Sequence, residues 1–329
     1  MPNKKSILIT GGTGFIGSHL AERCVEEGFD VVAFDRYNPN NHWGWLEQSV
    51  YRNDVKVILG DLRDYDSVYK AMQGCEAVFH LAALIGIPYS YVSPLAYIRT
   101  NIEGTYNVLE AAKNLKTDQV LITSTSETYG NAQYTPIDEN HPLVGQSPYS
   151  ATKIAADQLA LSYYRSFELP IKIVRPFNTF GPRQSSRAVI PTIVAQLLNG
   201  KNSIELGNLS PTRDLTYVTD TCNGFIEIFQ SDSLFGEVTN IGVNSEISIG
   251  ELVQFIANLM EVVLTIESSN DRVRPKNSEV DRLICDNSKL LKHTHWKPKY
   301  TLEQGISEVI EWMKNPENMN MYKSVEYNV

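Results

Sequence analysis

Two side chains that could transfer a proton lie four residues apart in a segment with a helical pattern. Tyr149 and Lys153 therefore share one face of the helix that we expect over Pro148–Ser166. The strand predicted at Gln119–Thr123 ends in the polar run Ser124–Glu127, at the sheet edge where α/β proteins bind ligands. A nearby ammonium group lowers the pKa of a phenol, as a cationic nicotinamide ring would. The pair predicts a tyrosine that acts as a base toward a hydroxyl group.

A glycine cluster near the N-terminus predicts a dinucleotide site. Gly11, Gly14 and Gly17 fall between the first predicted strand and the first predicted helix, where missing side chains let the backbone approach a pyrophosphate. Asp35 ends the second strand, where its carboxylate can accept hydrogen bonds from both hydroxyls of an adenosine ribose. This carboxylate would repel a 2′-phosphate and so favours NAD, whereas the adjacent Arg36 could receive the phosphate of NADP. NAD is the expected cofactor.

Strands and helices alternate through the first half of the chain. The predicted strands are Ser6–Thr10, Asp30–Phe34, Lys56–Leu59, Ala77–His80, Gln119–Thr123 and Ile171–Arg175. The predicted helices between them are Phe15–Glu27, Asp66–Met72, Ala96–Asn114 and Pro148–Ser166. This alternation is typical of an α/β fold with a doubly wound parallel (Rossmann) sheet.

After Arg175 the pattern becomes irregular, which predicts a smaller C-terminal substrate domain. Leu215–Gln230 again has the pattern of a strand end followed by a helix, so we expect the two domains to interleave. The predicted division assigns 1–175, with 214–242 returning to it, to an NAD-binding Rossmann domain. It assigns 176–213 and 243–329 to substrate binding.

The composition disfavours several classes of partner. The 329 residues are 42% apolar and carry a net charge of −9, whereas nucleic-acid backbones are held by clustered Lys and Arg. No stretch approaches the roughly 18 apolar residues of a membrane helix, and a glycine cluster follows the N-terminus too soon for a signal peptide. We therefore expect a soluble cytoplasmic protein with neither a nucleic-acid nor a membrane partner.

The cysteines and His80 are expected to be structural, and no metal site is predicted. Cys24, Cys75, Cys222 and Cys285 lie far apart without paired spacing, which predicts buried reduced thiols. His80 has no carboxylate or cysteine at ligand spacing, so we expect it to pack or cap at a strand end.

Five motifs resemble those of the extended short-chain dehydrogenases that modify nucleotide sugars, and they span nearly the whole chain. They are GGTGFIG at Gly11–Gly17, GDLRD at Gly60–Asp64, HLAA at His80–Ala83, YSATK at Tyr149–Lys153 and RPFNTFGPR at Arg175–Arg183. The resemblance implies a nucleotide-sugar substrate. It implies cofactor contacts from Gly11, Gly14, Phe15, Ile16, Gly17, Asp35, Arg36, Asp61, Leu62, Leu81, Ala82, Ala83 and Lys153.

The triplet Thr125-Ser126-Glu127 distinguishes between the reactions of that family. Its 4-epimerases usually carry a small residue at the position of Glu127, because they remove no second proton. A carboxylate there resembles the base of the 4,6-dehydratases, which oxidise C4 and then remove the acidified C5 proton. The dTDP-glucose 4,6-dehydratases have an aspartate at the position of Ser126 as the acid toward departing water, whereas the GDP-mannose 4,6-dehydratases carry Ser-Glu as this chain does. The resemblance leaves the identity of the acid open.

The resemblance thus implies a redox-neutral elimination. Tyr149, assisted by Lys153 and Thr125, would accept the C4 hydroxyl proton as hydride passes to NAD. Glu127 would remove the C5 proton as water leaves C6, and hydride would return to C6 to give a 4-keto-6-deoxy sugar.

Three alternatives remain beside this interpretation. A UDP-glucuronate decarboxylase shares the Thr-Ser-Glu triplet, but its substrate calls for a further cation near the sugar, which Leu84–Tyr91 does not offer. A 4-epimerase of the same family is the second. A catalytically silent NAD-binding regulator is the third, and the complete set of catalytic residues weighs against it.

Further kinship points to one substrate. Asn38–Asn41 with Trp43–Trp45, Leu84–Tyr91, Gly145–Lys153 and Ser185–Ile193 are similar to the 4,6-dehydratases of bacterial legionaminic-acid biosynthesis, which act on a nucleotide-linked N-acetylglucosamine. Both UDP and GDP remain open as the nucleotide. Guanidinium groups suit diphosphate oxygens. The implied substrate-binding residues are Ile87, Asn178, Arg187, Arg213, Arg274 and Glu279.

The resemblance also implies a homodimer joined through Ala96–Asn114 and Pro148–Ser166. Pairing about a two-fold axis is the commonest soluble assembly. Apolar or aromatic residues beyond one core-facing stripe support this expectation, namely Tyr106, Leu109, Leu161 and Tyr164.

Overall fold

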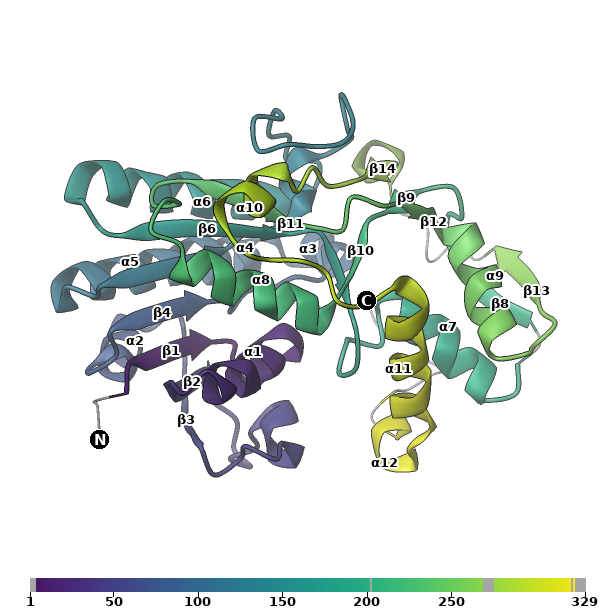
Figure 1. Ribbon diagram of the computed structural model, residues 1–329, viewed down its shortest axis with the longest axis horizontal. Helices are drawn as coiled ribbons and strands as arrows, with labels where there is room; N and C mark the ends of the chain where they lie inside the picture. Colours follow the sequence, from purple (N-terminus) through teal and green to yellow (C-terminus); the bar gives the residue numbers. More distant parts are fainter. Residues whose placement is uncertain (1–3, 202, 269–274, 321, 323–329) are drawn as a thin grey trace.

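The computed structural model describes residues 4–201, 203–268, 275–320 and 322, and a seven-stranded sheet lies at its centre (Figure 1). All its strands run parallel, in the order β11-β6-β5-β4-β1-β2-β3. Their bounds are β1 Ser6–Thr10, β2 Asp30–Arg36, β3 Val55–Gly60, β4 Ala77–His80, β5 Gln119–Thr123, β6 Ile171–Pro176 and β11 Val238–Ile241. The six predicted strands are all present, and the predicted α/β fold with a doubly wound parallel sheet is confirmed.

Helices cover both faces of this sheet, which explains why its strands are continuous apolar runs. Successive strand residues point to opposite sides, so Ile7 and Ile9 pack on one face and Leu8 on the other. The first face is covered by α1 (Phe15–Glu26) and α8 (Val218–Gln230). The second face is covered by α2 (Tyr65–Met72), α5 (Gly104–Leu115) and α6 (Pro148–Phe167).

The strand order reverses between β1 and β4, and this is where an open parallel sheet forms a ligand crevice. Thr10 ends β1, and its hydroxyl connects β1 to the end of β4 and the segment that follows it. It accepts a hydrogen bond from the Ala82 backbone N–H (3.1 Å) and lies 2.7 Å from His80 Nδ1. The other ring nitrogen of His80 lies 3.0 Å from the Thr105 hydroxyl. His80 is buried and packed at a strand end, as predicted.

The helix predicted over Ala96–Asn114 is interrupted, because a π-turn lies inside it. The chain forms α4 (Pro94–Tyr97), the π-turn η2 (Ile98–Glu103) and then α5. The wider turn contains the buried Asn101, whose side chain accepts from the Leu84 N–H (2.8 Å) and donates to the Leu84 carbonyl (3.0 Å). A π-turn inside a helix often marks a functional site. Here it fixes the segment that follows β4.

The smaller region is formed by α7 (Val189–Leu198), α9 (Ile249–Leu259) and short strands. The strands are β7 Asn178–Phe180, β8 Ser203–Leu206, β9 Thr212–Arg213, β10 Leu215–Tyr217, β12 Ile247–Ser248, β13 Thr265–Ser268 and β14 Arg282–Leu283. Figure 1 shows α7, α9, β8 and β13 gathered at one end, with α11 (Leu302–Lys314) between them and the central sheet. The chain crosses between the regions more than once, because α8 and β11 return to the sheet. The domain boundaries themselves stay a prediction.

Two of the residues expected at a dimer face are core residues instead. Leu109 in α5 and Leu161 in α6 are 0% and 8% exposed, and both pack in the core on the second face of the sheet. That part of the prediction is wrong. The second stripe is buried because α5 and α6 lie against each other, where the Tyr163 hydroxyl donates to Glu110 (2.9 Å). Tyr106 is 44% exposed.

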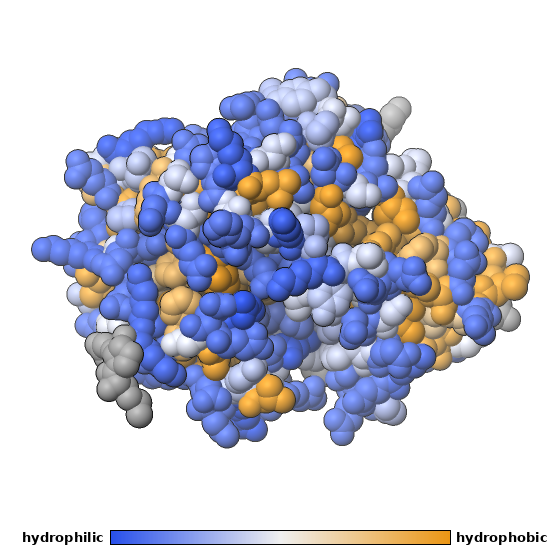
Figure 2. Space-filling model, viewed as in Figure 1, coloured by the Kyte–Doolittle hydropathy of each residue, from blue (hydrophilic) through white to orange (hydrophobic). Residues whose placement is uncertain are grey.

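The described chain has no helix that is both long and apolar enough to cross a membrane. All four cysteines are buried free thiols, as predicted. Figure 2 shows a mainly hydrophilic face on which hydrophobic residues gather in separate patches, one of them beside α9.

The buried His80 makes stability depend on pH in a calculable direction. Burial lowers its pKa from 6.5 to about 3. Between these values the unfolded chain binds a proton that the folded chain refuses, so stability is full above pH 6.5 and falls as the pH drops. Between pH 7 and pH 5 the free energy of unfolding of His80→Asn should fall by about 2 kcal/mol less than that of the wild type. Urea unfolding at the two pH values measures this difference. Exposed His42→Asn is the control, and equal losses in all three proteins would contradict the assignment.

Candidate active site

The loop between β1 and α1 has the shape of a pyrophosphate cradle. Gly11 has a φ of +70°, and a β-carbon there would lie 3.0 Å from the Ala82 backbone. At Gly17 a β-carbon would lie 2.0 Å from the Gly11 carbonyl oxygen, so only glycine allows α1 to approach the loop. No side chain caps the start of α1 at Gly14, which leaves the first helical N–H groups to a ligand. The loop and the helix terminus together fit an anionic dinucleotide.

Asp35 lies beside this loop at the end of β2, and Thr13 orients it. The Thr13 backbone N–H and hydroxyl both donate to Asp35 Oδ2, at 3.1 and 2.6 Å. The Arg36 N–H donates to the other carboxylate oxygen (2.7 Å). Asp61 follows β3 nearby, and a hydrogen bond from Arg63 lowers the pKa of this carboxyl group, with a smaller contribution from Arg36. These carboxylates gather on the adenosine side of the crevice.

The other predicted cofactor residues lie just after β3 and β4 and in the first turn of α1. Leu62 is buried, and its carbonyl accepts from the Asn107 side chain (3.0 Å). Leu81 donates its N–H to the Thr10 carbonyl (3.1 Å). Ala82 and Ala83 continue from β4 beside the glycine loop. Phe15 and Ile16 open α1.

The catalytic tyrosine candidate is almost fully enclosed. Tyr149 lies in the first turn of α6, is 7% exposed and packs with Ile87 and Tyr97. Burial raises the pKa of Tyr149 well above that of a free phenol, and the negative charge of Glu127 raises it further. A hydrogen bond with the Thr125 hydroxyl acts in the opposite direction. Thr125 is therefore the described side chain that favours the ionised phenol.

Lys153 lies one turn beyond Tyr149 and is buried on the same side of α6. Its Nζ donates to the Thr123 carbonyl at the end of β5 (2.6 Å). Burial lowers the pKa of Lys153, and the negative charge of Asp157 opposes that shift. Asp157 in turn binds the buried Arg175 guanidinium (2.7 Å) and the Ser124 hydroxyl (2.5 Å). This network gives the buried ammonium a negative neighbour.

The triplet Thr125–Glu127 follows β5 and lies against the start of α6. Ser126 and Glu127 open the short helix η3 (Ser126–Tyr129), and the Glu127 N–H donates to Thr125 Oγ1 (3.3 Å). Ser126 is buried, whereas Glu127 is partly exposed. The structure thus brings all five predicted catalytic residues to the carboxyl end of β5 and the start of α6.

A cation reaches the segment after β4 from a distant part of the chain. A β-carbon built at Gly86 would lie 3.5 Å from both Arg187 Nη1 and the Tyr97 hydroxyl. Tyr97 also donates to the Gly86 carbonyl. Gly86 is next to Ile87, which packs on Tyr149, so the Arg187 guanidinium lies near the catalytic cluster. The segment carries no cation of its own, but the loop before α7 brings one to it.

Two further predicted substrate residues, Arg213 and Glu279, lie close together in the smaller region. Arg213 is buried at the end of β9, and its guanidinium lies 3.8 Å from a Glu279 carboxylate oxygen. Next to it, the buried Asp214 accepts from the Val243 and Asn244 N–H groups (both 2.9 Å) and fixes this segment. Burial raises the pKa of Asp214 to about 6.

Asn178 begins β7, and its side-chain oxygen is buried without a hydrogen-bond partner. A buried acceptor without a partner is costly, which suits a ligand that donates to it. Arg274 lies outside the described residues.

Hydrogen bonds of Ser278 join the segment that carries Glu279 to the segments around Tyr149. Tyr91, which packs against the Tyr149 cluster, has its hydroxyl 2.5 Å from the Ser278 hydroxyl. The Ser278 hydroxyl donates to the Gln146 carbonyl (2.7 Å), just before α6, and the next residue is Glu279. The proposed diphosphate-binding segment is therefore tied to the catalytic cluster.

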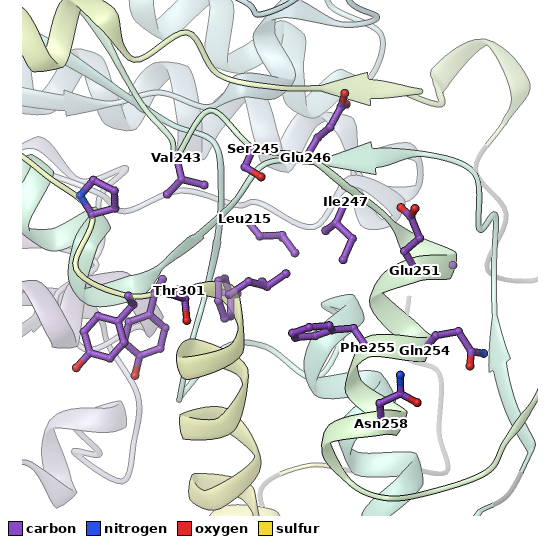
Figure 3. Close-up of a pocket in the computed structure, with 16 residues that line it drawn as sticks. Leu215, Val243, Ser245, Glu246, Ile247, Glu251, Gln254, Phe255, Asn258 and Thr301 are labelled. Atoms are coloured by element: carbon purple, nitrogen blue, oxygen red, sulfur yellow. The ribbon is translucent and has the colours of Figure 1, made fainter.

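A large hollow lies elsewhere, between α9 and α11, with a volume of about 860 Å³ (Figure 3). Figure 3 shows Phe255, Ile247 and Leu215 around it, with Gln254, Asn258 and Glu251 along α9. Among the described residues, none of those predicted to be catalytic or to bind substrate lines it.

Sequence reasoning missed several residues that shape the site. Thr13 lies inside the quoted glycine motif, and Asp157 follows Lys153 at helical spacing, so local patterns could have indicated both. Asn101, Tyr97 and Ser278 act through contacts with distant segments, and no local pattern marks them. Across the described residues no group of three or more metal-ligand side chains occurs.

Comparisons with known proteins agree with this geometry. A model of the family described as GDP-mannose 4,6 dehydratase matches residues 8–309. The chain is 32% identical over 329 residues to a UDP-N-acetyl-alpha-D-glucosaminuronate decarboxylase of Bacillus cytotoxicus, covering 96% of this chain and 99% of the relative. It is 31% identical to a dTDP-glucose 4,6-dehydratase of Xanthomonas campestris, covering 93% and 92%.

The fold has close counterparts among solved structures. A dTDP-glucose 4,6-dehydratase of Bacillus anthracis, solved in complex with NAD, superimposes with a TM-score of 0.84 at 28% identity. The match covers 98% of this chain and 100% of that one. Sheet order, glycine loop and the Tyr149/Lys153 pair thus define an NAD-dependent nucleotide-sugar epimerase or dehydratase in the broad sense. The chain belongs to the GDP-mannose 4,6-dehydratase family.

Cofactor choice is expected to follow Asp35. The wild type should release NAD or NADH when denatured, because the carboxylate repels a 2′-phosphate. In Asp35→Asn that repulsion is absent, so the ratio of NAD to NADP affinity should fall roughly tenfold or more. Asp30→Asn, at the exposed amino end of the same strand, is the control. Release of NADP from the wild type would show that Arg36 governs the pocket.

Proposed function

We propose that the chain is a 4,6-dehydratase that converts a nucleotide-linked N-acetylglucosamine to its 4-keto-6-deoxy derivative. The observation that carries the proposal is the position of the Glu127 carboxylate in η3, which contacts α6, the helix that begins with Tyr149 in its first turn. A 4,6-dehydratase needs two bases on one sugar, and a simple 4-epimerase needs one. Thr125 joins the two candidates, because it hydrogen-bonds Tyr149 and accepts from the Glu127 N–H.

NAD is the cofactor of this reaction. When bound, it supplies the acceptor for the C4 hydride and the donor that later reduces C6. The glycine loop and the uncapped start of α1 fit its pyrophosphate, and Asp35 with Thr13 fits its adenosine ribose.

The chain's own residues then move protons. Tyr149 takes the proton of the C4 hydroxyl, with its ionised form favoured by Thr125. Lys153, buried one turn later on α6, assists this step. Oxidation at C4 acidifies the C5 proton, which Glu127 removes. Water leaves from C6, and two buried hydroxyl residues, Ser126 and Thr128, flank that base in sequence. Arg213 and Asn178 are the residues proposed to hold the diphosphate and the sugar.

A decarboxylase of a nucleotide-linked uronic acid is the second candidate. Arg187 favours it, because its guanidinium lies beside Gly86 and could neutralise a C6 carboxylate. The Bacillus cytotoxicus relative is named as such a decarboxylase. Incubation with UDP- and GDP-N-acetylglucosamine, and separately with UDP-glucuronate and UDP-N-acetylglucosaminuronate, separates the candidates by mass. The proposal expects loss of water from an N-acetylglucosamine substrate, and loss of carbon dioxide from a uronate would replace it.

Two variants should separate the proposed half-reactions. Glu127→Gln keeps Tyr149, Lys153 and Thr125, so it should still bind substrate and form NADH absorbance. Its rate of dehydrated product should fall about 10²–10⁴-fold, because general-base catalysis is typically worth that much. Tyr149→Phe should form no NADH at all. An undiminished product rate in Glu127→Gln would show that Glu127 is not the base.

A homodimer is also proposed, with the exposed apolar side chains of α4, η2 and α5 at its interface. Leu95, Ile98 and Tyr106 are 56%, 47% and 44% exposed there. Light scattering at micromolar concentration should give twice the 37.0 kDa chain mass, and Tyr106→Glu should lower it. A wild-type monomer would contradict the assembly.

A cytoplasmic location is proposed as well. It is supported by four cysteines that are all buried free thiols, as is usual in a reducing compartment.

A further inference from the structure

The helix α11 contacts a substrate-side strand directly and the cofactor loop through η1. The turn before α11 is anchored on α8, because its backbone N–H groups donate to the Asp220 carboxylate (3.0 Å). At Gly305, α11 lies so close to β7 that a β-carbon would be 2.7 Å from the Phe180 ring. Strand β7 begins with Asn178, the proposed substrate residue. The first half of α11 therefore rests on the substrate side of the site.

The second half of α11 reaches the cofactor side through a pair of tryptophans. The Trp312 ring packs edge-on against Trp45, with centroids 5.4 Å apart and an interplanar angle of 68°. Trp45 lies in the short helix η1 (Gly44–Gln48), and its backbone N–H donates to the Thr13 carbonyl (3.0 Å). Thr13 in turn holds Asp35. Two residues, Trp45 and Thr13, thus connect α11 to Asp35 at the proposed ribose site.

A second set of contacts returns from Trp312 to the substrate strand. Tyr322 is 7% exposed and packs against Trp312, with centroids 5.9 Å apart. Its hydroxyl donates to the Gln184 carbonyl (2.7 Å). The Gln184 side-chain amide donates to the Thr179 carbonyl in β7 (2.9 Å). The ends of this path are Asp35 on the cofactor side and β7 on the substrate side.

We propose that Trp45, Trp312 and Tyr322 form an aromatic clasp that holds η1 on the glycine loop and so retains NAD through each catalytic cycle. The proposed reaction requires such retention, because the hydride taken at C4 must be returned to the same sugar at C6. Without the clasp, η1 keeps its contacts with Thr13 and the buried Leu46 but loses its tie to α11, and we expect the dinucleotide to dissociate faster. The inference rests on the proposed NAD site but not on the identity of the sugar.

Dissociation of labelled NAD tests the clasp without any sugar present. The protein is loaded with radiolabelled NAD and diluted into unlabelled NAD, and the label remaining on the protein is followed. Trp45→Ala and Trp312→Ala should each release NAD roughly threefold to tenfold faster, the range that an edge-to-face aromatic pair supplies. The double variant should be no faster than the faster single variant, because both lose one shared contact. Glu311→Ala, the neighbour of Trp312 with a 69% exposed side chain, should release NAD at the wild-type rate.

Milder variants keep the test decisive if an alanine variant unfolds. Tyr322→Phe removes only the hydrogen bond to Gln184 and should speed release roughly twofold to tenfold. Wild-type release rates in the tryptophan variants, additive effects in the double variant, or no change in Tyr322→Phe would each overturn the clasp. Since the measurement uses NAD alone, a failure of the proposed dehydratase activity leaves its outcome readable.

Discussion

The burial of the Tyr149 hydroxyl is the constraint on which the rest of the site depends. A phenol that serves as a base has to ionise, whereas burial raises the pKa of Tyr149 and the charge of Glu127 raises it further. The Thr125 hydrogen bond opposes this rise, and the buried Lys153 follows one turn later on the same helix. Lys153 can stay charged there because Asp157 lies beside it and is held by Arg175. A bound cationic nicotinamide is the remaining favourable charge, which ties the first proton transfer to an occupied cofactor site.

The same enclosure explains why so many distant segments are fastened to one another. Asn101 holds the segment after β4, Tyr91 bonds Ser278 across the cleft, and Arg213 pairs with Glu279 in the smaller region. Each contact ties a segment that is distant in the sequence to the surroundings of the predicted site. The proposed clasp on α11 would likewise hold the cofactor, since NADH has to stay bound until it returns the hydride to the sugar.

Local patterns in the sequence were sufficient for six of the seven strands of the central sheet and for the Tyr149/Lys153 pair, but they did not indicate β11. The apolar run of β1 and the four-residue spacing of Tyr149 and Lys153 are properties of single segments, so they can be read without a structure. The π-turn around Asn101 could not be predicted, because the Asn101 side chain is held by hydrogen bonds to Leu84, 17 residues away in the segment after β4. Leu109 and Leu161 were misassigned to a surface because helical periodicity does not tell which neighbour buries a second stripe. Arg187 reaches Gly86 only through the fold, which is why the sugar segment was predicted to lack a cation.

The central claim is that a proton leaves C5 and is later replaced from solvent while water is lost from C6. Turnover of UDP- or GDP-N-acetylglucosamine in deuterated water, followed by mass spectrometry and NMR of the product, tests it most directly. The account predicts a product that has lost one water and carries one deuterium at C5. A dehydrated product without deuterium at C5 would contradict the elimination assigned to Glu127.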